Sequence, residues 1–352
     1  MTRMSTQKKP YLIIPKLIEQ PTWGGSYILE TKGWGKKAQF NNVKIGQSYE
    51  LFGQSKLSLS NSSSLMQVDE GGIDVLVFKE KRPFPLIKFT QARGNSFQLH
   101  VKRSEQGKKW KAKAESWFYL ENGKVTLGIK KNVNIHKYKR TCLDIEKTMK
   151  ELSVLVKRGE LKRKEAERVA KLFIVEKNPW QFVNVLDVKK GDVIDLSAGG
   201  LHHSWEEDKK YPLGNIVYEV QQDVNDQSST IRSFDQGKFK ENGDVREIAV
   251  KDYFSFLDTD EKNNHFDLKK KDSIHLFKTP YYCLDRLLID KETAGTTSSS
   301  FHHLFVVRGE ARVSDGGNAI VVKRGHSCFI PQGIAYTIKS QGKTELLKTF
   351  LP

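Results

Sequence analysis

The sequence contains little cysteine and no long hydrophobic run. Its three cysteines, Cys142, Cys283 and Cys328, are too few and too widely spaced for a disulfide framework or a thiolate metal site. The longest apolar runs, such as Tyr11–Pro15 and Val75–Phe78, are much shorter than the roughly 20 residues of a membrane helix. The N-terminal segment contains lysines but no apolar stretch typical of a secretory signal. These absences predict a cytoplasmic protein without a membrane partner.

Basic residues outnumber acidic residues by 59 to 42, which gives a formal net charge of +17. Such a charge attracts nucleic acid, but it also attracts a small phosphorylated substrate. The most basic stretches, residues 102–113 and 157–171, also contain glutamates, and the sequence has no zinc-finger or RNP-type motif. Mixed charge of this kind is typical of a solvated surface. We therefore expect no nucleic-acid partner.

Short strands are predicted over most of the chain. Runs such as 97–101 and 124–129 have the length of strands and are separated by turns rich in Gly, Asn and Asp. Many short strands at close spacing predict an antiparallel sandwich or barrel. From about residue 141 to residue 175, in contrast, apolar residues recur at helical spacing on both sides of Gly159. The sequence thus predicts a mainly β fold with a helical insertion.

The length of 352 residues predicts about two domains. A polar, turn-rich stretch near residues 256–272 marks a boundary between them. A pattern of glycine turn, strand and second turn occurs in both halves, and two related barrels explain this repetition. We predict that residues 1–139 and 178–262 form the first, catalytic domain, that residues 140–177 form the helical insertion, and that residues 263–352 form the second domain.

Two segments place polar side chains together on one face of a predicted strand. Because side chains alternate along a strand, Ser96, Gln98 and His100 share one face. The same alternation brings Lys113 and Glu115 together. Such a face can also be the solvent side of a sheet, since histidine is intermediate in burial and is often a surface or hydrogen-bonded residue.

A third segment places His202 and His203 directly after a predicted strand. A glutamine oxygen, a carboxylate and imidazoles brought together suit a divalent metal with an open position for substrate. Nitrogen and oxygen donors without cysteine favour zinc, with iron, manganese and cobalt as alternatives. Spacing alone leaves both the metal site and the solvent-facing sheet open.

Several blocks of sequence occur in one order along the chain. They are Phe84-Pro85-Leu86-Ile87-Lys88, Ser96-Phe97-Gln98-Leu99-His100, Lys113-Ala114-Glu115-Ser116-Trp117, Ala198-Gly199-Gly200-Leu201-His202, Tyr218-Glu219-Val220-Gln221-Gln222 and Ser229-Thr230-Ile231-Arg232-Ser233-Phe234-Asp235. Together with Trp23-Gly24-Gly25 and Gly46-Gln47-Ser48-Tyr49-Glu50, they resemble type I mannose-6-phosphate isomerase (phosphomannose isomerase) of the cupin superfamily. The resemblance implies two cupin (jelly-roll) barrels with the α-helical insertion in the first. It also implies one zinc ion per chain, a sugar phosphate as the small-molecule partner, and a monomer or a homodimer.

The resemblance also implies roles for particular residues. The implied metal ligands are Gln98, His100, Glu115 and His202, the implied essential arginine is Arg232, and Lys113, Ser96 and Lys88 match positions that line the sugar-phosphate pocket. The implied reaction interconverts mannose 6-phosphate and fructose 6-phosphate through an enediolate. The enediolate is negatively charged, and a divalent metal and a cation such as Arg232 or Lys113 stabilise its charge. A base moves a proton between C1 and C2 of the sugar.

Three features depart from the family pattern. Ser197 stands where the family usually has proline, residues 205–212 form an extra loop, and the segment before the essential arginine is longer than usual. Ser228 therefore occupies the position of a family acidic residue, and either Asp226 or Asp223 is expected to replace it in the substrate pocket.

The base that moves the proton stays open among Glu219, Asp226, His203 and Lys113. We assign catalytic roles to Arg232, Lys113 and Glu219, and substrate binding to Ser96, Lys88, Lys113 and Asp226. Ordinary structural roles are the alternatives: Glu219 at a barrel rim, Arg232 paired with Asp235, and Lys88 solvated.

The second half contains His302, His303 and His326 but no comparable set of ligands, so it is expected to be a degenerate cupin. For the whole chain, the alternatives are an isomerase of another sugar phosphate and a cupin that binds sugars or a regulatory partner without catalysis.

Overall fold

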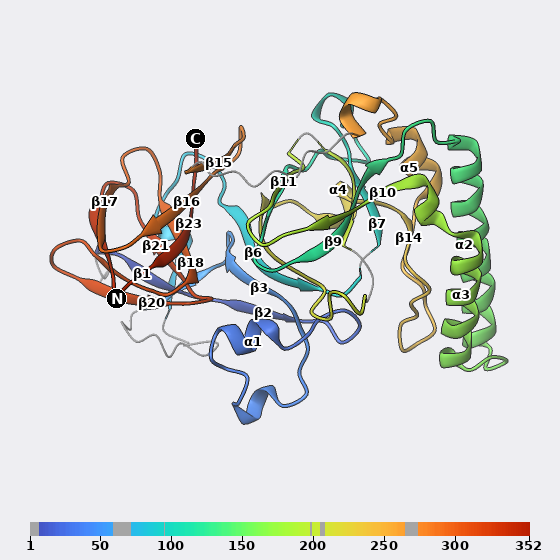
Figure 1. Cartoon of the computed structure of the whole chain (residues 1–352), viewed down its shortest axis with the longest axis horizontal. Helices are drawn as coiled ribbons and strands as arrows, with labels where there is room; N and C mark the ends of the chain where they lie inside the picture. The colour runs from blue at the N-terminus through green and yellow to red at the C-terminus, as the bar shows by residue number, and fades with distance from the viewer. Residues whose placement is uncertain (1–6, 59–71, 95, 198, 205–207, 265–273) are drawn as a thin grey trace.

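The computed structural model describes residues 7–58, 72–94, 96–197, 199–204, 208–264 and 274–352. Its strands form four antiparallel sheets that are stacked as layers, with helices against one outer face (Figure 1). The predicted mainly β fold is thus confirmed. No helix in the described ranges is long and apolar enough to cross a membrane.

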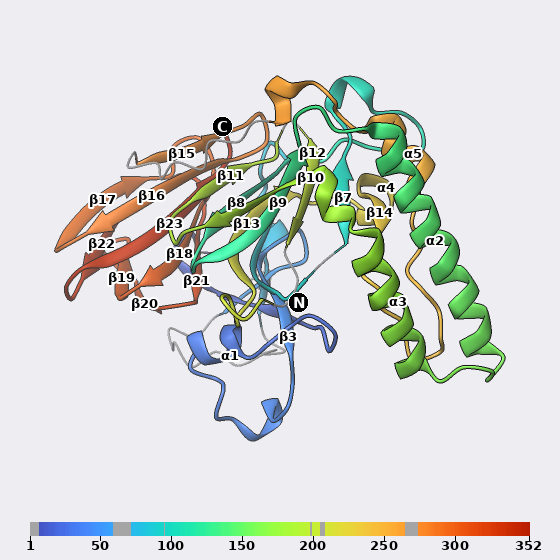
Figure 2. The same cartoon turned by 45° about the vertical axis from the view of Figure 1, so that its right-hand side comes forward.

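A five-stranded and a six-stranded sheet face each other in the middle of the molecule (Figure 2). The five-stranded sheet has the order β10 (Val183–Val188), β9 (Gly123–Ile129), β12 (Gly200–Ser204), β7 (Phe97–His100) and β14 (Ile231–Phe234). The six-stranded sheet has the order β11 (Val193–Asp195), β8 (Glu115–Tyr119), β13 (Asn215–Gln222), β6 (Pro85–Ala92), β3 (Ile45–Leu51) and β2 (Lys16–Glu19).

The other two sheets form the opposite side of the molecule and enclose a core of their own. The eight-stranded sheet has the order β15 (His275–Lys278), β16 (Cys283–Ile289), β23 (Thr344–Phe350), β18 (His302–Arg308), β21 (Ser327–Ile330), β1 (Tyr11–Ile14), β4 (Lys56–Leu57) and β5 (Ile73–Asp74). The four-stranded sheet has the order β17 (Glu292–Thr296), β22 (Ala335–Ser340), β19 (Glu310–Ser314) and β20 (Ala319–Lys323). Strands β1, β4 and β5 therefore join the sheet of the C-terminal strands. The two-barrel arrangement and the domain boundaries remain predictions.

Side chains that alternate between the two faces of each strand explain how the sheets pack together. In β8, Trp117 and Tyr119 pack between the five-stranded and six-stranded sheets, whereas Phe118 packs on the opposite side against the eight-stranded sheet. Both faces of the six-stranded sheet are thus buried, which explains why its strands contain apolar residues at odd and even positions alike.

Helices cover the outer face of the five-stranded sheet. They are α2 (Ile135–Lys157), α3 (Arg163–Lys177) and α5 (Val250–Phe256), and the shorter helices elsewhere are α1 (Tyr27–Thr31), α4 (Asp226–Ser229), η1 (Ala38–Phe40), η2 (Val75–Val77), η3 (Arg103–Glu105), η4 (Pro179–Phe182) and η5 (Glu261–Asn264). Helix α2 begins earlier than its apolar pattern indicates, because the Asn134 side chain accepts a hydrogen bond from the backbone N–H of Lys137 and caps the first turn. Buried Tyr138 and Ile145 share a core with Phe97 and Leu99 of β7. The helices therefore hold the outward face of the strand whose inward face presents Gln98 and His100.

Candidate metal centre

Three strands bring the predicted ligands together between the five-stranded and six-stranded sheets. Strands β7 and β12 are paired so that Gln98 lies opposite His202, and both side chains point inward while Leu99 and Leu201 join the helix-covered core. Strand β8 of the facing sheet begins with Glu115. The donor atoms of His100, Glu115 and His202 lie within 4.8 Å of one another, and all three residues are buried.

The main chain fixes the orientation of both imidazoles. Nδ1 of His100 lies 2.8 Å from the carbonyl oxygen of Ser229, and Nδ1 of His202 lies 3.2 Å from that of Gly200. A carbonyl oxygen only accepts, so each Nδ1 donates its hydrogen and each Nε2 presents a lone pair to the cluster. Metal-binding histidines are held in this way by partners behind the ring.

Glu115 provides the negative charge of the cluster. Its carboxylate accepts a hydrogen bond of 2.6 Å from the indole N–H of Trp117, and its Oε2 lies 2.9 Å from Nζ of Lys113. Burial alone raises the pKa of Glu115, but Lys113 and His100 hold it well below its usual range. The carboxylate is therefore ionised and acts only as an acceptor.

The contact between His100 and Glu115 indicates whether the cluster suits a bound cation. Nε2 of His100 lies 3.1 Å from Oε2 of Glu115, so two acceptor atoms face each other. A proton between them is disfavoured, because burial and the nearby Lys113 lower the pKa of His100. Burial and the neighbouring His100 lower the pKa of His202 to about 3. Neutral imidazoles and one carboxylate are a donor set that a divalent cation completes.

Gln98 completes the group on the fourth side. Its Nε2 lies 2.8 Å from Nε2 of His202, which leaves the amide oxygen as a further donor after rotation of the amide. Two nitrogen and two oxygen donors suit zinc, whose four ligands lie about 2.0–2.2 Å from the metal and hence roughly 3.3 Å apart. The distances of 3.1 Å from Glu115 to His100 and 3.9 Å from Glu115 to His202 agree with that separation.

A cavity of about 410 Å³ opens beside the cluster. Among the residues that line it are Lys88, Gln98, Lys113, Glu115, Glu219, Asp223, Asp226 and Arg232. Its volume falls in the range of roughly 300–1,000 Å³ for small-molecule sites. The structure therefore brings most of the predicted metal, catalytic and substrate-binding residues to one cavity.

Lys88 and Glu219 form a buried ion pair of 2.9 Å across strands β6 and β13. Lys88 also donates to Gln221 at 2.8 Å, and Thr90 donates to Glu219 at 3.2 Å. Burial, opposed by Lys88 and reinforced by Glu115, raises the pKa of Glu219. Both side chains are buried, so the alternative of a solvated Lys88 is wrong.

Arg232 pairs with Asp226 at 2.6 Å and donates from Nε to the hydroxyl of Ser96 at 3.0 Å. The alternative partner, Asp235, instead lies 3.5 Å from Arg246. Asp226 is therefore the carboxylate that pairs with Arg232, and its role as the acidic residue of the substrate pocket stays a prediction. Asp223 also lines the cavity, where it accepts a hydrogen bond from the backbone N–H of Gly53 at 3.3 Å.

Some cavity residues were not predicted from the sequence. Thr90 and Gln221 lie two residues beyond Lys88 and Glu219 on the same strand faces, so alternation along these blocks predicts both. Arg246 lies in an irregular segment after β14 and has no such signal. The side chain of His203, as well as residues 205–207 of the extra loop, lie outside the described residues.

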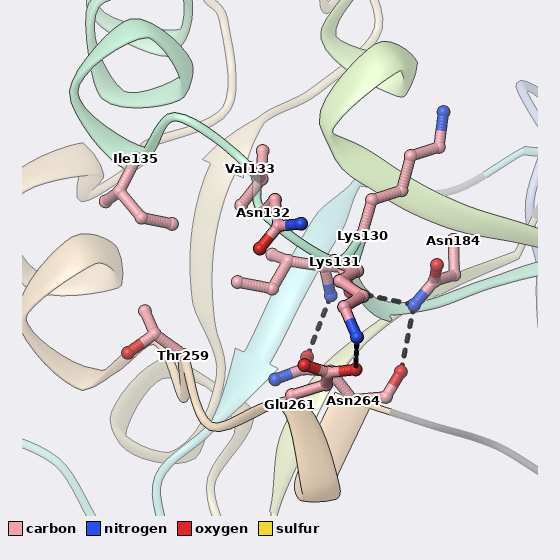
Figure 3. A pocket seen from close by; sticks show the side chains of 10 residues that line it. Lys130, Lys131, Asn132, Val133, Ile135, Asn184, Thr259, Glu261 and Asn264 are labelled. Carbon is pink, nitrogen blue, oxygen red and sulfur yellow. Dashed lines mark hydrogen bonds and ion pairs between the residues drawn. The ribbon is translucent and has the colours of Figure 1, made fainter.

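A second cavity lies near the start of α2 and is lined by other residues (Figure 3). Its volume is about 380 Å³. The side chains of Asn184 and Asn264 bond the backbone of Ile129, and Lys131 pairs with Glu261 at 2.7 Å. None of its lining residues belongs to the metal cluster.

The histidines of the second half have separate partners. His302 bonds Tyr336 at 2.7 Å, and His303 lies 3.1 Å from the hydroxyl of Tyr218. Among the described residues, His100, Glu115 and His202 are the one group of three with a metal-binding arrangement.

Comparisons with known proteins agree with this fold. Residues 272–350 match a family model described as the cupin domain of mannose-6-phosphate isomerase. The structure is similar to mannose 6-phosphate isomerase from Bacillus subtilis, with a TM-score of 0.65 and 17% identity over 97% of this chain and 99% of that chain.

Two further solved structures show the same fold. A zinc-bound mannose 6-phosphate isomerase matches with a TM-score of 0.59 and 14% identity over 97% of this chain and 99% of that one. A variant of phosphomannose isomerase from Salmonella typhimurium matches with the same score, identity and coverage. No curated protein matches the chain in sequence. The predicted resemblance to type I mannose-6-phosphate isomerase is confirmed.

Proposed function

We propose that the protein is a metal-dependent aldose–ketose isomerase that interconverts mannose 6-phosphate and fructose 6-phosphate. The observation that supports it most is the convergence of two imidazole Nε2 atoms with the Glu115 carboxylate, which lines a cavity that lysines and arginines also line. The similar proteins of known structure are named for the same reaction, and one of them contains zinc.

Gln98, His100, Glu115 and His202 would hold one divalent ion, with zinc favoured by their nitrogen and oxygen donors. When bound, such an ion supplies Lewis-acid stabilisation to the oxygens of the sugar. The other steps depend on the side chains of this chain.

Arg232 and Lys113 stabilise the negative charge of the enediolate. Lys113 is buried beside Glu115, and Arg232 lies opposite Gln98 in the pairing of β14 with β7. Fixed cations in a cavity that excludes water stabilise a developing charge more strongly than they do in bulk water.

Glu219 is the base that we favour for the proton transfer between C1 and C2. It lines the cavity, and Lys88 and Thr90 hold both of its oxygens. Burial raises its pKa, which makes its carboxylate a stronger proton acceptor. Asp226 is the weaker base. Its partial burial raises its pKa, but Arg232 and Lys113 together lower the pKa by more. Proton transfer of this kind contributes roughly 10²–10⁴-fold to the rate.

A coupled assay tests the proposal by supplying mannose 6-phosphate and detecting fructose 6-phosphate. We expect turnover by the purified protein, loss of turnover with a chelator, and recovery with added zinc. Glu115→Gln is expected to abolish turnover, while Glu261→Gln, an exposed glutamate at the other cavity, leaves it unchanged. Binding of the sugar phosphate without turnover, or turnover of a different sugar phosphate alone, contradicts the proposal.

A further inference from the structure

Two arginines on the wall of the metal-site cavity meet at one buried hydroxyl behind them. Arg232 donates to Oγ of Ser96 at 3.0 Å, and Arg246 reaches the same oxygen from Nη1 at 3.4 Å. Both arginines line the cavity, whereas Ser96 lies behind them and is fully buried. Guanidinium groups held side by side repel each other, so this arrangement is favourable where an anion lies between or in front of them.

Arg246 differs from the other cavity cations in how firmly it is paired. Lys88, Lys113 and Arg232 have ion pairs of 2.9, 2.9 and 2.6 Å. The pair of Arg246 with Asp235 is 3.5 Å long, and its side chain is 39% exposed, compared with 17% for Arg232. Arg246 can therefore turn its donors toward a ligand with the smallest loss of existing contacts.

We propose that Arg246 binds the phosphate group of the substrate and so selects sugar phosphates over free sugars, with the hydroxyl of Ser96 orienting the Arg246 guanidinium. This inference rests on the proposed function. Arginine suits the task because its planar fork donates two parallel hydrogen bonds to phosphate oxygens.

The spacing along β7 agrees with the length of the substrate. Ser96, directly before β7, is followed by Gln98 and His100 on the inward face, and residues two apart in an extended chain lie about 6.6–6.8 Å apart. In an open-chain hexose 6-phosphate, six bonds separate C2 from phosphorus, which is about 7–8 Å when extended. A sugar with its reacting carbons near Gln98 thus places its phosphate near Ser96 and Arg246.

The positions of Arg232 and Arg246 predict different roles for the two arginines. Arg232 lies opposite Gln98 in strand register, close to the predicted ligands, whereas Arg246 reaches only as far as Ser96. Loss of Arg246 should therefore weaken substrate binding and leave the chemical step largely intact, whereas loss of Arg232 should lower the rate of the chemical step.

The test compares Arg246→Gln and Arg246→Lys with the wild-type protein, and Arg168→Gln on the exposed face of α3 is the control. For mannose 6-phosphate we expect KM to rise about 10–100-fold in Arg246→Gln, as for loss of a charged hydrogen bond, with kcat within about threefold. Arg246→Lys should recover part of the loss, because it keeps the charge without the fork. Metal content should equal that of the wild type in every variant.

Calorimetry with mannose 6-phosphate and with mannose separates this inference from the proposed function. The wild type should bind the phosphorylated sugar more tightly, and Arg246→Gln should lose most of that difference whether or not the wild type turns the sugar over. Arginine-dependent binding without turnover would refute the isomerase and keep the phosphate site. Turnover with an unchanged KM in both Arg246 variants, or a loss confined to kcat, would refute the phosphate site and keep the isomerase.

Discussion

Breaking the buried pair of Lys113 and Glu115 should change both stability and metal binding. The two side chains are 5% and 2% exposed and lie 2.9 Å apart. Glu115→Gln keeps the shape of the side chain and an oxygen that accepts from Trp117, but it leaves the Lys113 ammonium buried without its counter-charge. Removal of one partner of a buried pair costs about 3–5 kcal/mol. We therefore expect the free energy of unfolding of the metal-free protein to fall by that amount.

The double variant Glu115→Gln with Lys113→Met shows whether the loss comes from the pair. With both charges removed, no buried charge is left uncompensated, so the loss should be smaller than the sum of the two single variants by about 2–3 kcal/mol. Urea denaturation of chelator-treated proteins measures all four free energies. Additive losses, within about 0.5 kcal/mol, would refute the account of this pair. The metal-induced rise in melting temperature should be present in the wild type and absent in both variants that lack Glu115.

Three further predictions follow from the site and its surroundings. Glu219→Gln should lower kcat about 10²–10⁴-fold with little change in KM, and an unaltered kcat in steady-state assays would exclude it as the base. Treatment with a chelator should remove activity without unfolding the protein, which circular dichroism checks, and zinc should restore it; activity that persists at zero metal content contradicts the mechanism. His303 is buried, and burial lowers its pKa to about 3, below the value of about 6.5 in the unfolded chain. The folded state therefore favours the neutral imidazole. Its contribution to stability is fully present above pH 6.5 and is lost as the pH falls toward 3. The free energy of unfolding of the wild type should therefore fall relative to that of His303→Gln by about 1.4 kcal/mol per pH unit between pH 6 and pH 4, and parallel pH profiles would disprove it.

Local alternation made part of the site predictable. Because side chains alternate along a strand, Gln98 and His100 had to share one face, and the structure places both between the sheets. The same rule placed Lys113 and Glu115 on one face, where the structure has their side chains 2.9 Å apart. The helices near residues 141–175 were predicted from apolar spacing, while the earlier start of α2 depends on the cap at Asn134.

The side-chain partners on neighbouring strands could not be predicted, because they depend on which distant strands pair with each other. Lys88 and Glu219 are 131 residues apart and meet only because β6 pairs with β13. The choice of Asp226 over Asp235 as the partner of Arg232 depends on the turn at α4 that precedes β14. The same holds for β1, which pairs with β21 although almost the whole chain lies between them. The roles of the site residues remain proposals that the variants above test.

Metal content of purified protein tests the central claim most directly. The wild type, a control variant His302→Gln and the double variant Gln98→Ala/His100→Ala are loaded with zinc, desalted and analysed for metal and protein. The predicted result is one zinc ion per chain in the wild type and the control, and none in the folded double variant. One ion per chain retained in the double variant would contradict the assignment of the metal centre.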